Sequence, residues 1–245
     1  MKNSLSTFLF IALGVLFFTA CEDHSTVVAN DEATMPATDQ KDDESASVSN
    51  EEYDRAFRAD YSNSLRGLWQ KPKLVIDIMG DISEKVVADL GAGSGYFSFP
   101  IAKKAQKTIA LEISEESIEK LNEKKLIELR EELQDQFEAR LTSNTSPNLK
   151  PGEADIVLIV NTYLFIRNEV GKSYLKEIYD VLPEFGQIVI VDFKKKRIEV
   201  NEIDAPTEIR VPLWVAENDL EEAGFKGIKS YDTKLDYQYI VTAYK

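Results

Sequence analysis

An acidic residue followed by alternating glycines is the part of this sequence with the clearest chemical meaning. Residues 89–95 read Asp-Leu-Gly-Ala-Gly-Ser-Gly and follow the apolar run Val-Val-Ala at 86–88. Glycine has no Cβ, so the backbone can turn here at positive φ and approach another group closely. A helix that begins directly after such a turn points its free N–H groups at a bound ligand. The pattern therefore predicts a strand, a glycine turn and a helix that surround a nucleotide-type ligand.

The spacing of the glycines narrows the kind of ligand. A dinucleotide-binding fingerprint, Gly-x-Gly-x-x-Gly, would need a glycine at position 96, where this chain has Tyr96. A second acidic residue, Glu112, follows the apolar residues 108–111. It comes about twenty residues after the first glycine, where an acidic side chain can accept both hydroxyls of a ribose. Together these features predict a site for an adenosyl ligand.

The form Asp-x-Gly-x-Gly-x-Gly resembles motif I of the class I S-adenosylmethionine-dependent methyltransferases. The resemblance covers about residues 53–245 and implies an α/β fold, a doubly wound, mostly parallel seven-stranded sheet with an antiparallel last strand. Four further segments are similar to a largely uncharacterised bacterial branch of that superfamily: Trp69-Gln70-Lys71-Pro72, Asn161-Thr162-Tyr163, Asp192-Phe193-Lys194-Lys195 and Tyr237-Gln238-Tyr239.

This resemblance implies S-adenosyl-L-methionine as the cofactor. It implies that the glycines lie near the methionine and ribose, that Asp89 lies near the amino acid end, and that Glu112 holds the ribose. The loop after the third strand usually carries an acid for the adenine amino group, but residues 142–144 read Thr-Ser-Asn, so Asn144 would have to replace it. The implied cofactor-binding residues are Asp89, Gly91, Ala92, Gly93, Gly95, Glu112, Asn144 and Asn161.

The candidates on the acceptor side follow the fourth strand. Asn161 and Tyr163 are expected at its carboxyl end, where ligands bind in open α/β sheets. Relatives often have histidines just after the tyrosine, but this chain has Leu164 and Phe165 there. The single histidine is His24, outside the expected domain, so no histidine base and no metal site are predicted. A soft or already ionised acceptor does not need such a base.

Strand-length and helix-length segments alternate from residue 53 onward, as in a parallel sheet covered on both faces. The helix expected from Ser114 has an N-cap and an approximate apolar stripe formed by Ile118, Leu121, Leu126, Leu129 and Leu133. The expected strands are 86–90, 108–112, 137–141, 154–160, 187–192, 228–231 and 237–243, and the other expected helices are 65–79, 96–105, 172–182 and 215–223.

The amino terminus has the features of an export signal. Lys2 precedes an apolar run at 8–18, which is too short for a comfortable membrane span. Residues 18–21 read Phe-Thr-Ala-Cys and resemble a bacterial lipobox. We therefore expect residues 1–20 to be a lipoprotein signal peptide and Cys21 to be lipidated. An uncleaved anchor helix is the alternative. Cys21 is the sole cysteine, so no intrachain disulfide is possible.

Residues 21–52 differ sharply in composition from the rest. They contain ten acidic residues against one lysine, with few apolar residues to bury. Such a segment is expected to be a disordered, extended linker. The formal net charge of the whole chain is −14. An acidic protein repels phosphates, so a nucleic acid acceptor is not expected.

Three interpretations remain open at this point. The first is a methyltransferase that is tethered to the cell envelope through Cys21 and acts on a small molecule or protein. The second is a non-catalytic envelope lipoprotein, a binding module that retains the methyltransferase fold. The third is a cytoplasmic enzyme whose translation starts at Met35, without signal and lipid. The first conflicts with the cytoplasmic synthesis of S-adenosylmethionine, and the sequence offers no explanation.

Overall fold

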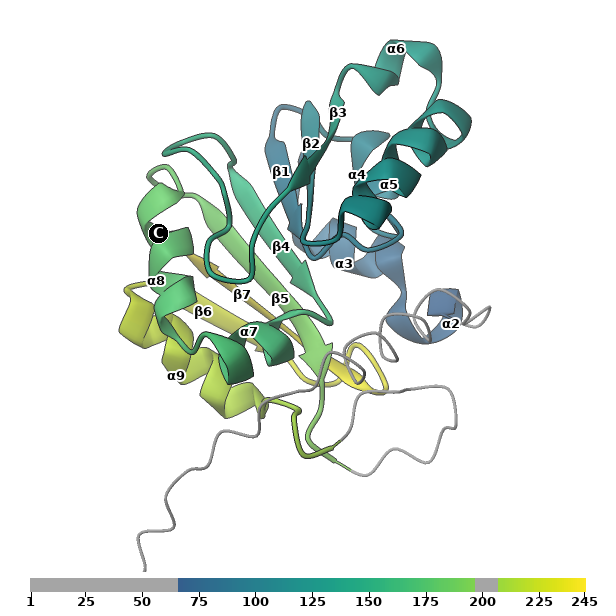
Figure 1. The fold of residues 1–245 in the computed structure, drawn as a ribbon. Helices are drawn as coiled ribbons and strands as arrows, with labels where there is room; N and C mark the ends of the chain where they lie inside the picture. The colour runs from purple at the N-terminus through teal and green to yellow at the C-terminus, as the bar shows by residue number, and fades with distance from the viewer. Residues whose placement is uncertain (1–65, 197–206) are drawn as a thin grey trace, which may run out of the picture. The chain divides into compact units, whose positions relative to one another are not determined.

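The computed structural model describes residues 66–196 and 207–245, which belong to the second of two compact units, residues 43–245. The expected signal peptide, Cys21, the acidic linker and Met35 lie outside the described residues. Figure 1 shows the arrangement of the helices and strands.

A seven-stranded sheet forms the centre of the described residues, in the order β3-β2-β1-β4-β5-β7-β6. Strands β1 to β5 pair in parallel, and β7 lies antiparallel between β5 and β6. The predicted mostly parallel sheet with an antiparallel last strand is confirmed. The strands are β1 Val86–Leu90, β2 Lys107–Glu112, β3 Phe137–Leu141, β4 Ile156–Val160, β5 Gln187–Phe193, β6 Lys226–Tyr231 and β7 Gln238–Tyr244.

Helices cover both faces of this sheet (Figure 1). Helices α7, α8 and α9 pack on one face, and α3, α4 and α5 pack on the other. Strand β4 is apolar and buried along its whole length, because a central parallel strand contacts helices on both sides. The helices are α2 Arg66–Gln70, α3 Pro72–Ile78, α4 Ser98–Ala102, α5 Glu115–Glu128, α6 Glu131–Gln134, α7 Tyr163–Glu169, α8 Ser173–Val181 and α9 Leu213–Ala223.

The single helix expected over 65–79 is wrong, because the structure has two helices there. Lys71 between them has a left-handed backbone with φ 48°, and Pro72 is the first residue of α3. Proline disfavours a helical conformation in the residue before it and has no N–H to continue the helix.

Helix α5 agrees with the sequence at its start and differs at its end. The Ser114 side chain accepts a hydrogen bond from the Ser117 N–H, which confirms the predicted N-cap. The expected apolar stripe is only partly buried: Leu121 is buried, whereas Leu126 is 65% exposed. The helix ends at Glu128, so the later leucines of the stripe continue in an extended residue and in the short helix α6.

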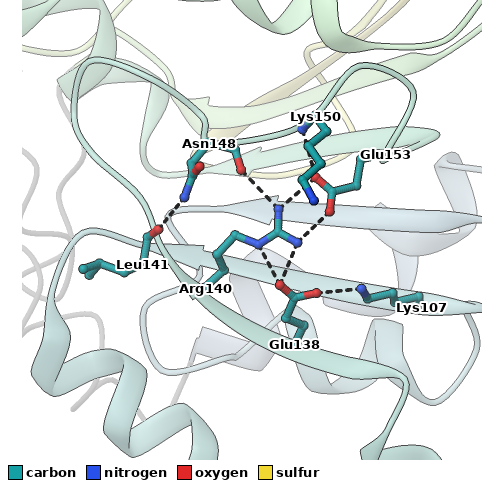
Figure 2. A network of polar contacts seen from close by, with 7 residues as sticks. All are labelled: Lys107, Glu138, Arg140, Leu141, Asn148, Lys150 and Glu153. Carbon is teal, nitrogen blue, oxygen red and sulfur yellow. Dashed lines mark hydrogen bonds and ion pairs between the residues drawn. The ribbon is translucent and has the colours of Figure 1, made fainter.

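An ion-pair network fixes the edge strand β3 to the loop that leads into β4 (Figure 2). Arg140 donates to both carboxylate oxygens of Glu153, at 2.9 and 2.7 Å, and to the Asn148 carbonyl oxygen at 3.1 Å. Its Nε donates to Glu138, which also accepts from Lys107 at 2.6 Å. Arg140 therefore anchors the loop that begins at residue 142 to β3 at two points, Asn148 and Glu153.

We expect this network to contribute stability that depends on pH. The hydrogen bonds from Arg140 lower the pKa of Glu153 to about 2, from an ordinary value of 4.5. A group with a lower pKa in the folded state stabilises the fold above its unfolded pKa and loses that contribution as the pH falls toward its folded pKa. Replacing Arg140→Met should therefore lower the free energy of unfolding at neutral pH by about 1–2 kcal/mol, after allowance for solvent screening.

Urea denaturation between pH 5 and pH 2 tests this expectation. The wild-type free energy of unfolding should fall more steeply over that range than that of Arg140→Met. The exposed Arg130, replaced in the same way, serves as the control. Equal slopes for wild type and Arg140→Met would show that the network does not stabilise the fold through Glu153.

Candidate functional site

The glycine turn lies between β1 and α4, as expected from the sequence. Gly91 and Gly95 both have a φ of 79°, a conformation that other residues rarely adopt. A Cβ on Gly91 would lie 2.2 Å from the Thr162 hydroxyl oxygen, and a Cβ on Gly95 would lie 2.4 Å from the Phe99 ring. The space left by these two glycines is therefore filled by the protein's own side chains. Their first role is to let β4 and α4 pack against the turn.

Glu112 at the end of β2 is bound by backbone N–H groups. Its Oε2 accepts from the Gly93 N–H at 2.9 Å, and its Oε1 accepts from the Ile113 N–H at 2.7 Å. Burial raises the pKa of this carboxyl, and the N–H groups oppose that rise. The sequence paired Glu112 with the glycine turn, and the structure brings them into direct contact. A carboxylate accepts more than two hydrogen bonds, so acceptor capacity remains.

Asp89 is buried beneath the same turn. Its Oδ2 accepts a hydrogen bond of 2.5 Å from the Ser98 hydroxyl of α4. Burial raises the pKa of Asp89 to about 6, while Ser98 and the charge of Arg66 act in the opposite direction. Its protonation state therefore changes close to neutral pH. An ionised Asp89 would favour a positively charged group nearby.

A small apolar pocket opens at the carboxyl ends of β1 to β4. Its walls include Glu112, Ile113, Asn144, Thr162 and Phe165. Asn144 thus lies in the same pocket as Glu112 and Gly91, and Ala92, the next residue of the turn, is buried. The pocket volume is about 50 Å³, well below the hundreds of Å³ of typical ligand sites. Ile113 lines the pocket and is 42% exposed, so its side chain has room to move. A ligand with an aromatic ring would enter only after such side chains moved aside.

Asn161 lies on the other side of Thr162, in a cluster of amides. Its backbone is left-handed, with φ 56°, and its N–H donates to the Val191 carbonyl oxygen of β5. Its Oδ1 accepts hydrogen bonds from the side-chain amides of Gln70 and Gln238. Both glutamines are fully buried. They lie in two of the segments that carried the family resemblance, but the sequence did not reveal their contact with Asn161.

Tyr163 points away from the pocket. Its ring is fully buried, and its hydroxyl donates to Asp219 of α9 at 2.6 Å. Burial and the Asp219 carboxylate raise the pKa of Tyr163 far above its ordinary value. Arg167 donates to the same Asp219 oxygen. In this arrangement Tyr163 supports the packing of α7 against α9.

Asp219 is a residue that the sequence analysis missed. It lies on the buried face of α9, three residues after Ala216 and four before Ala223. A charged residue on the apolar face of a helix is an informative signal, since such residues are rarely buried without a partner. That signal identifies the partner of a buried donor, here Tyr163.

Asp192 holds the start of α7 from the end of β5. Its Oδ2 accepts from the Leu164 N–H at 2.8 Å and its Oδ1 from the Phe193 N–H at 2.7 Å. Burial raises the pKa of Asp192 to about 7. The helix that carries Phe165 over the pocket is therefore anchored by a carboxylate from the neighbouring strand.

Residues 66–196 and 207–245 contain no cluster of three or more potential metal-ligating His, Cys, Asp or Glu side chains. In these same ranges, every helix is too short or too polar to span a bilayer.

Residues 87–186, which contain the glycine turn, Glu112 and Asn161, match a family described as a methyltransferase domain. A comparison with curated proteins gave no match.

Solved structures give many matches to the fold. An S-adenosylmethionine-dependent methyltransferase from Aquifex aeolicus has a TM-score of 0.65 and 20% identity, and the match covers 76% of this chain and 95% of that one. A similarly described methyltransferase from Mesorhizobium loti has a TM-score of 0.57 and 11% identity, over 71% and 96% of the two chains.

A possible exported protein from Bordetella parapertussis is also similar, with a TM-score of 0.60 and 13% identity over 77% of this chain and 72% of that one. At these identities the matches concern the fold. The sheet order, the glycine turn and these matches together identify the fold of the described residues as the Rossmann-like fold of the methyltransferases.

Proposed function

We propose that this protein binds S-adenosyl-L-methionine and transfers its methyl group to an acceptor that is not a nucleic acid. The observation that carries the proposal is the buried Glu112 carboxylate, bound to the Gly93 N–H at the edge of an apolar pocket. An adenosyl ligand needs such a combination, a carboxylate for the ribose hydroxyls beside an apolar surface for the base.

The residues that line the site fit this cofactor. Glu112 would accept from the ribose hydroxyls, and the side chains of Ile113 and Phe165 offer apolar contacts to a base. Asn144 lines the same pocket and would supply the side-chain carbonyl that replaces the missing acid. Asp89 lies beneath the glycine turn, on the side proposed for the methionyl part. When bound, the cofactor supplies a methyl group on a positively charged sulfur.

The chain's own contribution would be to position two partners and exclude water. Direct methyl transfer needs the acceptor lone pair in line with the bond that breaks, so alignment accounts for much of the rate. Movement of Phe165 and Ile113 would open the pocket, and their return over the ligand would exclude water. The net charge of −14 favours an acceptor that is not a polyanion.

A binding module without catalysis is the second candidate function. The burial of Tyr163 and its bond to Asp219 favour it, because this side chain could not act as a base at the acceptor. The buried Tyr163 does not exclude methyl transfer, because an already ionised acceptor needs no base. Methyl transfer by purified protein would separate the two.

The proposed location is the cell envelope. The apolar run at 8–18 followed by Ala20-Cys21 supports a lipidated amino terminus, and the acidic segment 21–52 supports a linker between lipid and domain. The similar fold of a possible exported protein agrees with a place outside the cytoplasm. Two acyl chains hold a protein on a bilayer without a membrane-spanning helix.

Glu112→Ala tests the cofactor site. We expect S-adenosylhomocysteine to bind the wild-type full-length chain and to lose about a hundredfold in affinity in the variant, since two hydrogen bonds to a charged group are removed. Isothermal titration measures this, and circular dichroism verifies that the variant is folded. The exposed Glu119 of α5, replaced in the same way, is the control. Equal binding by both variants would contradict the assignment of Glu112.

The pKa of Asp89, about 6, predicts a pH effect on cofactor preference. As pH rises from 5 to 7, Asp89 ionises and should favour the sulfonium of S-adenosylmethionine over the neutral thioether of S-adenosylhomocysteine. The ratio of their affinities should rise by about fivefold, which corresponds to about 1 kcal/mol. Titrations at both pH values measure the ratio. In Asp89→Asn it should stay constant, and the same rise there would assign the effect to another group.

Lipidation of Cys21 is tested by expression in a bacterial host fed with an alkyne-labelled fatty acid. We expect label on the full-length chain, in the membrane fraction, and none on Cys21→Ala. The control is Ser47→Ala, a substitution within the acidic segment 21–52, and this variant should keep its label. An unlabelled wild-type chain whose mature amino terminus lies at Met35 would instead support a cytoplasmic protein.

A further inference from the structure

A chain of hydrogen bonds runs from Arg66 through the amide cluster at the end of β4. Arg66 Nε donates to Gln70 Oε1, and Gln70 Nε2 donates to Asn161 Oδ1 at 3.4 Å. Gln238 Nε2 donates to the same Asn161 oxygen. Amide orientations are normally ambiguous, but a guanidinium group can only donate. Arg66 therefore fixes the oxygen of Gln70, which in turn fixes the orientation of Asn161.

Two polar groups of the cluster are not used within this chain of hydrogen bonds, one a donor and one an acceptor. With its Oδ1 occupied twice, Asn161 is left with its Nδ2 as a pair of N–H donors. Gln238 is fully buried, and its Oε1 has no partner in the part of the chain that the structure describes. A buried acceptor without a partner costs about 1–3 kcal/mol, so such an atom indicates a group that the cluster is built to receive.

The cluster lies beside the proposed cofactor pocket, on the same edge of the sheet. The pocket lies over the ends of β3, β2, β1 and β4, and the cluster lies over the ends of β4, β5 and β7. Gln238 pairs in register with Phe193, and Phe193 lies 5.9 Å from the ring of Trp69, centroid to centroid. The Trp69 indole N–H is a buried donor that also has no partner among the residues the structure describes.

We propose that Asn161 and Gln238 form the acceptor subsite and that it takes a carboxamide-type group, such as a peptide bond. The group's carbonyl oxygen accepts from Asn161 Nδ2, and its N–H donates to Gln238 Oε1. The proposal rests on the proposed function, since it concerns the molecule that lies next to the cofactor.

Charged groups fit this pair less well than a neutral amide does. An ammonium group has only donors and would face the N–H donors of Asn161. A carboxylate has only acceptors and would face the oxygen of Gln238. Arg66 and Gln70 act as positioning residues, because they set the direction in which Asn161 donates.

Nuclear magnetic resonance of the full-length chain tests the proposal, with N-methylacetamide as the probe. The side-chain N–H₂ signals of Asn161 are assigned by their loss in Asn161→Asp. This variant keeps an oxygen for Gln70 and Gln238, and aspartate tolerates the left-handed backbone. With S-adenosylhomocysteine bound, N-methylacetamide should shift these signals saturably, whereas acetate and methylammonium at equal concentration should not.

The affinity for N-methylacetamide should fall by about tenfold in Asn161→Asp and stay unchanged in Asn218→Asp, an exposed asparagine of α9. A shift with methylammonium but not with the amide would overturn the proposal. A second result would also overturn it: the Asn161 signals shift with S-adenosylhomocysteine but not with methylthioadenosine, and N-methylacetamide then causes no further shift. That result would assign the cluster to the amino acid end of the cofactor. N-methylacetamide is also titrated without any nucleoside, so that the subsite is tested separately from the cofactor. Failure of both nucleosides to bind would count against the proposed function instead.

Discussion

The close approach of Thr162 to Gly91 is the constraint on which the site depends. A side chain at position 91 would overlap the threonine, so the absence of a Cβ lets the end of β4 lie against the turn that follows β1. This contact separates two regions of the sheet edge. Thr162 contributes to the pocket with Glu112, while Asn161, one residue earlier, turns toward the amides on the other side. The two regions are therefore neighbours on the same edge of the sheet.

Three buried carboxylates at this edge are stabilised in different ways. Glu112 and Asp192 accept hydrogen bonds from backbone N–H groups, whereas the main hydrogen bond to Asp89 comes from the hydroxyl of Ser98. Burial raises the pKa of all three. Burying these carboxylates at the carboxyl ends of the parallel strands costs free energy, because they lose contact with water. Hydrogen bonds from the N–H groups of adjacent turns offset that desolvation cost. Such an edge is prepared for ligands that carry donors or positive charge.

The strands and the glycine turn could be predicted from the sequence because their signals are local. The apolar run that contains β4 and the capping serine at 114 act through nearby residues, and Glu112 is identified by its spacing from the glycine turn. The seven-residue helix α7 was not predicted, because it is short and its N-cap Thr162 makes no side-chain capping hydrogen bond. Tyr163 was expected at the crevice, but its orientation depends on Asp219, which is 56 residues away along the chain. Contacts of that separation leave no periodic signal.

The left-handed backbone of Asn161 affects how natural variation at this position should be interpreted. At φ 56° the residue types that adopt the conformation at little cost are glycine, asparagine and aspartate. Selection for the backbone alone would therefore keep homologues within that small set, whether or not they bind an acceptor. Gln70 lies in a helix and Gln238 in a strand, so their backbones impose no such limit. An evolutionary record of substrate choice should be sought at positions 70 and 238, where divergence would report a change of ligand.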